Sequence, residues 1–466
     1  MPGFDQISIA RGCRLAIAGL GGLLVAAAPA LARSVPAEGS ATIRVALGGD
    51  LIGPLHPMNR LTDRAFAEVA ELFRTADIGF ANQENSVFDL KGFMGYPAAE
   101  NGGGQPLRYA SHARDMKDMG LSLVSVANNH ATDFGPEGLT ATLRNLSAAG
   151  IVAGGAGLSD VAARGPVYVD SPKGAVALVA TASTFPPLAV AGSAIERHGI
   201  SSQTRPGISS LHVRKVRLLP RRQFEAVRQA VGPLALPEGD GFRIDDQLFR
   251  PGPAAAMHWE MKPDDRDALL AAVGEARQRA DLVMFSIHAH ETAGDAEAPT
   301  VPFNPMVLQR ANEAASPNDP RPANFQVELF HSVVDRGADI VARHGPHIIA
   351  GIEIFKGKPI FYGLGSLFLD FGGDRILDAP SGEKIYVPDS WFDGFVPICT
   401  FVAGRLERID LYPITLESHA GERSGSPSLA HGDHAHAILQ TLKKLSAPFG
   451  TEIEIVGDIG VITVRA

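Results

Sequence analysis

Cysteine is almost absent from this sequence, with two in 466 residues, Cys13 and Cys399. Cys13 lies in an N-terminal segment that we expect to be removed, so Cys399 would then stand alone. A chain with one thiol has no internal disulfide framework. Cys399 lies in the apolar run FVPICTF, which predicts a buried, inert thiol rather than a nucleophile.

An excess of positive charge is also lacking, because the net charge is −9 and the isoelectric point is near 5.9. This balance argues against binding to nucleic acid or to an anionic membrane surface through charge. Two catalytic or phosphate-binding motifs are missing as well. The run GGDLIG at residues 48–53 lacks the Lys-Ser/Thr ending of a P-loop. No Gly-x-Ser-x-Gly nucleophile elbow is present.

The first 32 residues have the layout of a secretory signal peptide. Arg11 and Arg14 precede an apolar run at residues 15–28, and small residues at 30–32 form a cleavage site. The alternative is an uncleaved membrane anchor, but the run is shorter than the ~20 residues of a typical span. We therefore predict cleavage before Arg33 and a periplasmic or secreted protein.

Apolar residues alternate between strand-like and helix-like spacing from residue 42 onward, which predicts an α/β fold. The composition, 45% hydrophobic and 20% charged, is that of a globular protein. Strands are expected at residues 43–47, 78–81, 121–127, 175–181, 282–287 and 339–342. Helices are expected at residues 64–73, 112–119, 264–280 and 325–336, and from Pro136 to near Gly150.

We assign residues 42–415 to one domain, interrupted by residues 190–262, which are rich in proline, glycine and basic side chains. We interpret this interruption as a solvated insertion. The alternative is a segment that lines the site and holds an anionic substrate. Residues 430–466 are expected to add a small C-terminal extension of one helix and one hairpin. Its histidine-rich start, residues 431–436, is interpreted as a solvated loop, with metal binding as the alternative.

Five predicted strands end in acid, amide or imidazole side chains. Functional sites of α/β sheets form outside the carboxyl ends of the strands. Carboxylates combined with histidines and an amide suit divalent transition metals. Each residue alone has an ordinary interpretation as a turn or surface residue, but together they favour one shared metal site. The strand ends are Gly48-Gly49-Asp50, Asn82-Gln83-Glu84-Asn85, Asn128-Asn129-His130, His288-Ala289-His290-Glu291 and Arg343-His344-Gly345-Pro346-His347.

The order of these motifs resembles that of the CapA family, capsule-biosynthesis proteins associated with poly-γ-glutamate. The resemblance covers roughly residues 42–415, and Ala127-Asn128-Asn129-His130 is its most specific part. The family in turn resembles calcineurin-like metallophosphoesterases. This implies an α/β fold of the four-layer αββα sandwich type, with the insertion and the C-terminal extension added, and a dinuclear metal site.

The resemblance also implies roles for individual residues. His130 would contact the substrate or protonate a leaving group. The metal ligands would be Asp50, Glu84, Asn129, His288, His344 and His347. Apart from the resemblance, we expect Asn128 and Arg343 to bind the substrate, since Arg343 adds a guanidinium beside the site that can hold an anionic group.

This chain departs from the family pattern at three places. Gln83 replaces an apolar residue, and Ala289-His290 stands where the family commonly has Trp-Gly. The family often has Gly-His-His-Pro-His where this chain has Arg343-His344-Gly345-Pro346-His347, so one histidine is missing. These departures leave the number of metal ions open.

The resulting hypothesis is an exported CapA-type protein with a metal-dependent, phosphoesterase-like hydrolase or transferase site. It would bind divalent metal, two ions of Mn, Fe or Zn. Its partners would be an acidic polymer or a phosphate-containing small molecule, with membrane-associated capsule machinery and no nucleic acid. The alternatives are a non-catalytic polymer-binding or assembly component of a poly-γ-glutamate export machine, and a stand-alone periplasmic phosphoesterase.

Overall fold

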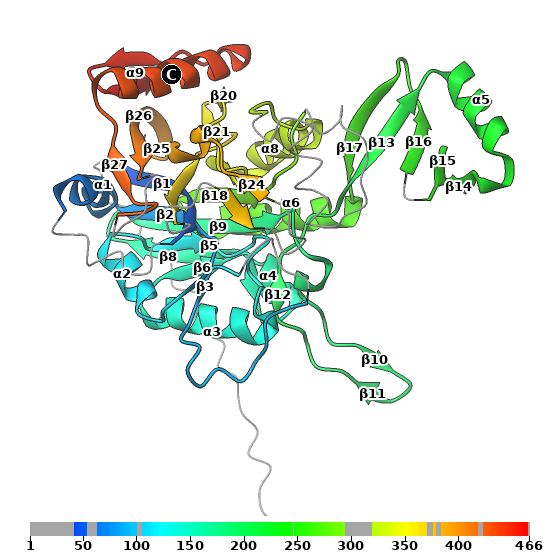
Figure 1. Ribbon diagram of the computed structural model, residues 1–466, viewed down its shortest axis with the longest axis horizontal. Coiled ribbons are helices and arrows are strands. Elements are labelled where there is room, and N and C mark those ends of the chain that lie inside the picture. The colour runs from blue at the N-terminus through cyan, green and yellow to red at the C-terminus, as the bar shows by residue number, and fades with distance from the viewer. Residues whose placement is uncertain are drawn as a thin grey trace, which may run out of the picture. The chain divides into compact units, whose positions relative to one another are not determined.

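The computed structural model describes residues 42–53, 63–99, 105–245, 247–293, 319–370, 387–417 and 423–464, and two short strands at 376–378 and 384–386 (Figure 1). All of them belong to the compact unit Ser40–Ala466. The predicted signal peptide lies outside the described residues. Among the residues described, none of the helices combines the length and apolar character needed to cross a membrane.

Two large sheets form the centre of this unit. The first has ten strands in the order β28-β29-β26-β25-β1-β2-β5-β6, with β22 beside β1 and β27 beside β26. These are β1 Thr42–Ile52, β2 Ile78–Gln83, β5 Leu123–Ser125, β6 Val152–Gly154, β22 Ser366–Leu369, β25 Asp393–Val402, β26 Arg405–Leu416, β27 Pro427–Leu429, β28 Glu454–Val456 and β29 Ile459–Thr463.

The second sheet has six strands in the order β20-β21-β19-β18-β9-β8. Strands β9, β18 and β19 run parallel to one another, and so do β1, β2, β5 and β6 in the first sheet. The strands of the second sheet are β8 Val167–Ser171, β9 Gly174–Ala182, β18 Leu282–His288, β19 Ile340–His344, β20 Ile352–Phe355 and β21 Lys358–Phe361.

Three hydrophobic cores stack these sheets and the helices into four layers. Val45 and Phe80 of the first sheet share one core with Leu178 and Met284 of the second, so the two sheets pack face to face. The outer face of the first sheet is covered by α1 Arg64–Arg74, α2 His112–Asp118 and α3 Gly135–Ala148. The outer face of the second is covered by α6 Pro263–Arg279 and α8 Asn324–Arg336. The predicted αββα sandwich is confirmed.

Local sequence signals explain where these elements begin. Helix α1 follows Asp63, whose carboxylate accepts a hydrogen bond from the Ala65 N–H at 3.0 Å. Helix α3 has Pro136 in its first turn, where a missing N–H costs nothing. Strand β1 is buried on both faces because Val45 and Ala46 enter different cores, which explains its unbroken apolar run.

The interruption at residues 190–262 contains a folded unit. Strands β13 Val213–Leu219, β14 Leu236–Glu238, β15 Gly241–Ile244, β16 Gln247–Pro251 and β17 Ala256–Met261 form a five-stranded sheet, accompanied by α5 Arg221–Val231. Phe242 is buried there, with its ring 5.0 Å from Phe224 and 5.1 Å from Phe249. Arg214 and Arg250 pair with Glu260. The segment is thus more ordered than a solvated loop, and these arginines pair within it.

The C-terminal helix and hairpin are integral to the domain rather than an added extension. Helix α9, Gly432–Ser446, packs Leu439 and Leu442 into the core between the sheets. Strand β29 pairs with β26 and so continues the ten-stranded sheet. The predicted hairpin is formed by β28 and β29, and it turns at residues 457–458.

Cys399 lies on β25 and is completely buried. Burial, reinforced by the charge of Asp410, raises the pKa of its thiol far above the usual range. The thiolate is the nucleophilic form, so Cys399 is the inert thiol that the sequence predicts.

Candidate metal centre

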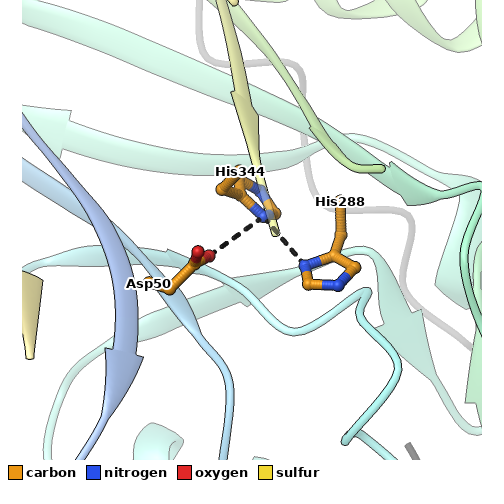
Figure 2. A group of neighbouring side chains, drawn as sticks. All are labelled: Asp50, His288 and His344. Atoms are coloured by element: carbon orange, nitrogen blue, oxygen red, sulfur yellow. Dashed lines mark hydrogen bonds and ion pairs between the residues drawn. The ribbon is translucent and has the colours of Figure 1, made fainter. Parts of the chain in front are cut away.

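Four strand ends from the two sheets meet at one place. Asp50 lies near the end of β1, and Glu84 follows β2. His288 and His344 end β18 and β19 and are paired in register. Figure 2 shows the His344 ring between Asp50 and His288, with interactions to both. The carboxyl ends of parallel strands in both sheets thus form the site.

A close approach of two backbones sets the position of Asp50. The register of β1 shifts between Leu47 and Asp50, and the Asp50 N–H donates to the carbonyl of Gly365 at 3.3 Å. A Cβ atom at Gly49 would lie 1.8 Å from that same carbonyl oxygen. Only glycine fits there, so Gly49 is required by this close packing of two backbones.

The Asp50 carboxylate is buried but held in its ionised form. Oδ1 accepts from Asn82 Nδ2 at 2.8 Å, and Oδ2 accepts from the Gly345 N–H at 3.0 Å. Oδ2 also lies 3.0 Å from His347 Nδ1. Burial works to raise the pKa of Asp50, but the His347 hydrogen bond and the nearby imidazoles outweigh it and hold the pKa far below its usual range.

The Glu84 carboxyl is buried beside Asp50 and is short of donors. Oε2 accepts from Asn82 Nδ2 at 3.2 Å. Oε1 lies 3.7 Å from His288 Nε2, and among the described residues it has no hydrogen-bond partner. Burial, together with the charges of Asp50 and Asp133, raises the pKa of Glu84 well above its ordinary value. A buried oxygen without a donor needs an explanation, and a bound cation supplies one.

The imidazole nitrogens at the site face one another. His288 Nδ1 lies 3.3 Å from His344 Nδ1, and His288 Nε2 lies 3.0 Å from His290 Nε2. Ser286 Oγ lies 2.7 Å from the other nitrogen of His344 and fixes that ring. Burial lowers the pKa of His344 to about 4 and that of His290 to about 3, and it lowers the pKa of His288 well below its ordinary value. Uncharged imidazoles with converging nitrogens fit a divalent metal site.

Backbone strain accompanies His347. Its φ is 57°, in the left-handed region that few non-glycine residues adopt. The ring meets Asp50 on one side and the edge of Trp391, with 4.8 Å between ring centroids, on the other. Such strain persists where the surroundings over-determine it, often at functional sites.

Three groups of three side chains could each hold a metal ion. Within each group, the ligand atoms all lie within 4.8 Å of one another. The groups are Asp50, His288 and His344; Glu84, His288 and His290; and Asp50, Glu84 and His347. The structure therefore brings together five of the six residues predicted as ligands. The sixth, Asn129, is buried in the turn after β5, and its ligand role stays a prediction.

The two residues expected to bind substrate have other roles. The Arg343 guanidinium is fully buried and donates to the main-chain carbonyls of Ala289, Tyr362 and Glu291 at 2.9–3.0 Å. It supports the strand ends and does not face a substrate. Asn128 is also fully buried. Its amide nitrogen donates to the Gln83 carbonyl at 2.7 Å and its amide oxygen accepts from the His130 N–H at 3.1 Å. In place of the predicted contact with substrate, both residues position the strand ends and the turn of the site.

His130 lies beside a carboxylate at the edge of the site. Its Nδ1 is 2.8 Å from Asp133 Oδ2, and its side chain is 10% exposed while that of Asp133 is completely buried. A carboxylate on one ring nitrogen orients the imidazole and leaves Nε2 to exchange a proton. The structure thus supports the position of His130 and adds Asp133 as its partner.

Two site residues were not predicted. Asn82 donates to Asp50 and Glu84 and lies 3.3 Å from His288 Nδ1, so it links three ligands. His290 faces His288. In both cases, the signal available in the sequence was that the residue lies two positions from a predicted ligand. Residues two apart in an extended segment point to the same side, so Asn82 shares a side with Glu84 and His290 with His288.

With this geometry described, the sequence can be compared with known families. Residues 44–300 and 314–370 match the family described as bacterial capsule synthesis protein PGA_cap. The chain belongs to this family. Most of the sandwich, including every candidate ligand, lies within the matched residues.

Relatives in the PGA_cap family include proteins with and without an assigned role. The uncharacterized protein y4sH of Sinorhizobium fredii is 30% identical over 435 residues, which cover 85% of this chain and 88% of that protein. The PGA biosynthesis protein CapA of Bacillus subtilis is 24% identical over 318 residues, 68% of this chain and 60% of that protein.

Solved structures resemble this chain only distantly. A hypothetical protein of Thermus thermophilus gives a TM-score of 0.38 at 13% identity, over 80% of this chain and 98% of that one. A phosphatase of Mycoplasma pneumoniae gives a TM-score of 0.36 at 12% identity, over 81% and 95%. The four-layer assignment rests instead on the sheets and cores of this chain.

Proposed function

We propose that this PGA_cap-family protein is a metal-dependent hydrolase or transferase that acts on a phosphate ester or an acidic polymer. One observation carries the proposal: a buried cluster of carboxylates and uncharged imidazoles lies next to a histidine–aspartate pair at the site edge. The first part suits a cation, and the second suits proton transfer. A site that only stabilised the fold would need neither converging imidazoles nor an orphaned carboxylate oxygen.

The metal would be held by Asp50, Glu84, His288, His344 and His347, with Mn, Fe or Zn in one or two positions. A bound divalent ion supplies positive charge that lowers the pKa of water and stabilises anionic transition states. Asn82 holds the two carboxylates in place by donating to both. The structure holds Asp50 ionised and the histidines uncharged, which is the form in which both types of side chain bind metal.

His130 would exchange a proton at the reacting oxygen. Asp133 fixes the ring by its contact with Nδ1, which leaves Nε2 to carry the exchanged proton. Asn128 anchors the turn by accepting from the His130 N–H and donating to the carbonyl of Gln83 beside Glu84. Through these contacts the turn and the metal ligands belong to one hydrogen-bonded network.

An acidic polymer is the substrate class that the relatives' names support. The Bacillus anthracis relative is named capsule biosynthesis protein CapA, and the Bacillus subtilis relative carries PGA biosynthesis in its name. We extend that role to this chain as part of the proposal, together with export by the signal peptide and association with membrane-bound capsule machinery. Intact-mass analysis of the exported protein tests cleavage before Arg33, and a full-length product in the membrane fraction would contradict it.

Turnover by a His130→Ala variant tests the catalytic part. Purified protein loaded with Mn, Fe or Zn is assayed with p-nitrophenyl phosphate, bis(p-nitrophenyl) phosphate and poly-γ-glutamate. We expect the variant to keep its metal and to lose ~100-fold in kcat, the usual scale of general acid–base catalysis. The matched control is His436→Ala, an exposed histidine whose ring contacts only a main-chain carbonyl among its described partners.

Two outcomes would count against this proposal. Near-wild-type turnover by His130→Ala would end the catalytic assignment of His130. Metal binding and poly-γ-glutamate binding by the wild type without any turnover would instead support the non-catalytic assembly role.

A further inference from the structure

We propose that His290 is a metal ligand, and that its ring occupies the space that a side chain at position 345 would take. The inference rests on the proposed metal centre and names one of its ligands. It concerns two positions that lie 55 residues apart in the sequence, His290 and Gly345. The structure brings these two positions into contact.

The His290 ring fills the space that a side chain at position 345 would take. A Cβ atom added at Gly345 would lie 2.7 Å from His290 Cδ2 and 3.1 Å from His290 Nε2. It would also lie 3.1 Å from His288 Cε1. The backbone of Gly345 has a φ of 121°, which side-chain-bearing residues rarely adopt. A side chain at position 345 would therefore have to displace the His290 ring, so the two compete for the same space.

The ring of His290 is aimed at the ligand cluster. Its Nε2 is 3.0 Å from His288 Nε2, and Glu84, His288 and His290 offer ligand atoms within 4.8 Å of one another. Two nitrogens bound at about 2.1 Å to one ion and about 90° apart would themselves be about 3.0 Å apart. The observed separation thus equals that of neighbouring ligands on one ion.

The main chain holds His290 in this orientation. Its N–H donates to Thr184 Oγ1 at 2.9 Å, and the preceding Ala289 N–H donates to the His344 carbonyl at 3.0 Å. The segment after β18 therefore stays extended, and His290 points to the same side as His288. Figure 2 shows His288, whose Nε2 faces the His290 ring, beside His344 and Asp50.

Metal titration of a His290→Gly variant tests the assignment without relying on activity. Metal-free wild type and variant are titrated with Co²⁺ in competition with a chromophoric chelator, and the visible d–d absorption of bound cobalt is recorded. We expect one binding step to weaken at least ~10-fold, the smallest effect typical of losing a group that supports a metal site. The cobalt spectrum should change, and added imidazole should restore both properties.

Two further variants sharpen the result. His434→Ala removes an exposed histidine on α9 and should titrate like wild type. Gly345→Ala places a methyl group against the His290 ring, so its effect on cobalt affinity should be smaller in the His290→Gly background than in wild type. Circular dichroism identifies any variant that fails to fold.

The outcomes separate this inference from the proposed function. If wild type binds no cobalt, both are overturned. If wild type binds cobalt and His290→Gly binds it with the same affinity and spectrum, the metal centre stands and the role of His290 is overturned. Equal effects of Gly345→Ala in both backgrounds would show that the two positions do not compete for space.

Discussion

Two regions of this protein are rich in histidine, and they use it differently. At the strand ends, His288 and His344 are buried, His290 is partly buried, and their ring nitrogens face one another. At the start of α9, His431 and His434 are exposed, and each contacts a carboxylate of its own, on Asp458 and Asp393, at 3.1 and 2.9 Å.

The difference shows that surroundings decide the chemistry of a histidine cluster. An exposed imidazole with its own carboxylate has its hydrogen-bonding needs met. Buried imidazoles that face each other have lone pairs directed at one point and no charge to repel a cation. Among the described residues, the groups with metal-binding spacing are all at the strand ends and none is at α9.

Removal of Asp50 should give the largest contrast between the two regions. We expect Asp50→Ala to lower bound metal at least ~10-fold, because this carboxylate belongs to two of the three ligand groups. The loss also leaves the Gly345 N–H without this acceptor and removes one of the two carboxylates to which the Asn82 amide donates. Elemental analysis after equilibration with limiting metal measures the effect, and His434→Ala is the control. Equal metal content in the two variants would contradict the proposed difference between the histidines at the strand ends and those at the start of α9.

The stability of the metal-free protein should depend on pH through the buried histidines. The pKa values of about 3 for His290 and about 4 for His344 lie below the 6.5 of an unfolded histidine, so the unfolded chain takes up protons that the folded protein does not. The stability they contribute is therefore complete above pH 6.5 and is lost as the pH falls toward 4. Each contributes a slope of up to about 1.4 kcal/mol per pH unit.

The raised pKa of Glu84 acts in the opposite direction. The stability that Glu84 contributes to the folded protein is lost as the pH rises through the pKa of Glu84 in the folded state. The pH dependence from this one carboxyl is smaller than the combined pH dependence from His288, His290 and His344. Urea denaturation of metal-free protein at pH 7 and pH 5 measures the slope. We expect Glu84→Gln to steepen it, His344→Gln to reduce it and His434→Ala to leave it unchanged. A slope insensitive to His344 would contradict the assignment.

Metal binding should release a proton from Glu84, an effect of intermediate size. Burial and neighbouring negative charges raise the pKa of this carboxyl, and a bound cation lowers it again. Calorimetric titration in two buffers of different ionisation enthalpy measures the number of protons released. We expect up to about one more proton from wild type than from Glu84→Gln. Equal release would place the proton on another group.

The smallest effect is expected at α9. Substitution of His434 by Ala removes one exposed contact, so the free energy of unfolding should change by at most ~1 kcal/mol and metal content should not change. Thermal unfolding and elemental analysis check this. A measurable loss of metal would reveal a second metal site among the exposed histidines at the start of α9.

The alternation of strands and helices was predicted from apolar periodicity, whereas the four-layer sandwich and the individual ligands were implied by the resemblance to the CapA family. The strand before Asp50 and the helix carrying Phe66 and Phe73 were found from apolar spacing alone. The polar strand ends were grouped into one metal site because parallel strands place their carboxyl ends at one edge of a sheet. The resemblance then selected the individual ligands, and the structure brings five of the six together.

The errors arose where a role depends on contacts distant in sequence. Arg343 looks like an anion-binding residue until the carbonyls of Ala289 and Tyr362 are seen to occupy its guanidinium. His290 looks like a loop histidine until Gly345 is placed beside it. Likewise, the insertion reads as a polar loop because each of its strands is short and only their pairing creates a buried face around Phe242.

The position of β1 has a consequence for the order of folding. This strand carries Asp50, yet residues 42–46 pair with residues 398–402 of β25, more than 350 positions later. Contacts so distant in sequence form late and slow the search for the native state. A nascent chain that ends before Asp393 leaves β1 as an open sheet edge, with unpaired main-chain groups ready to pair with other chains. Synthesis of the last strands thus closes the sheet around the first ligand, which couples completion of the chain to completion of the site.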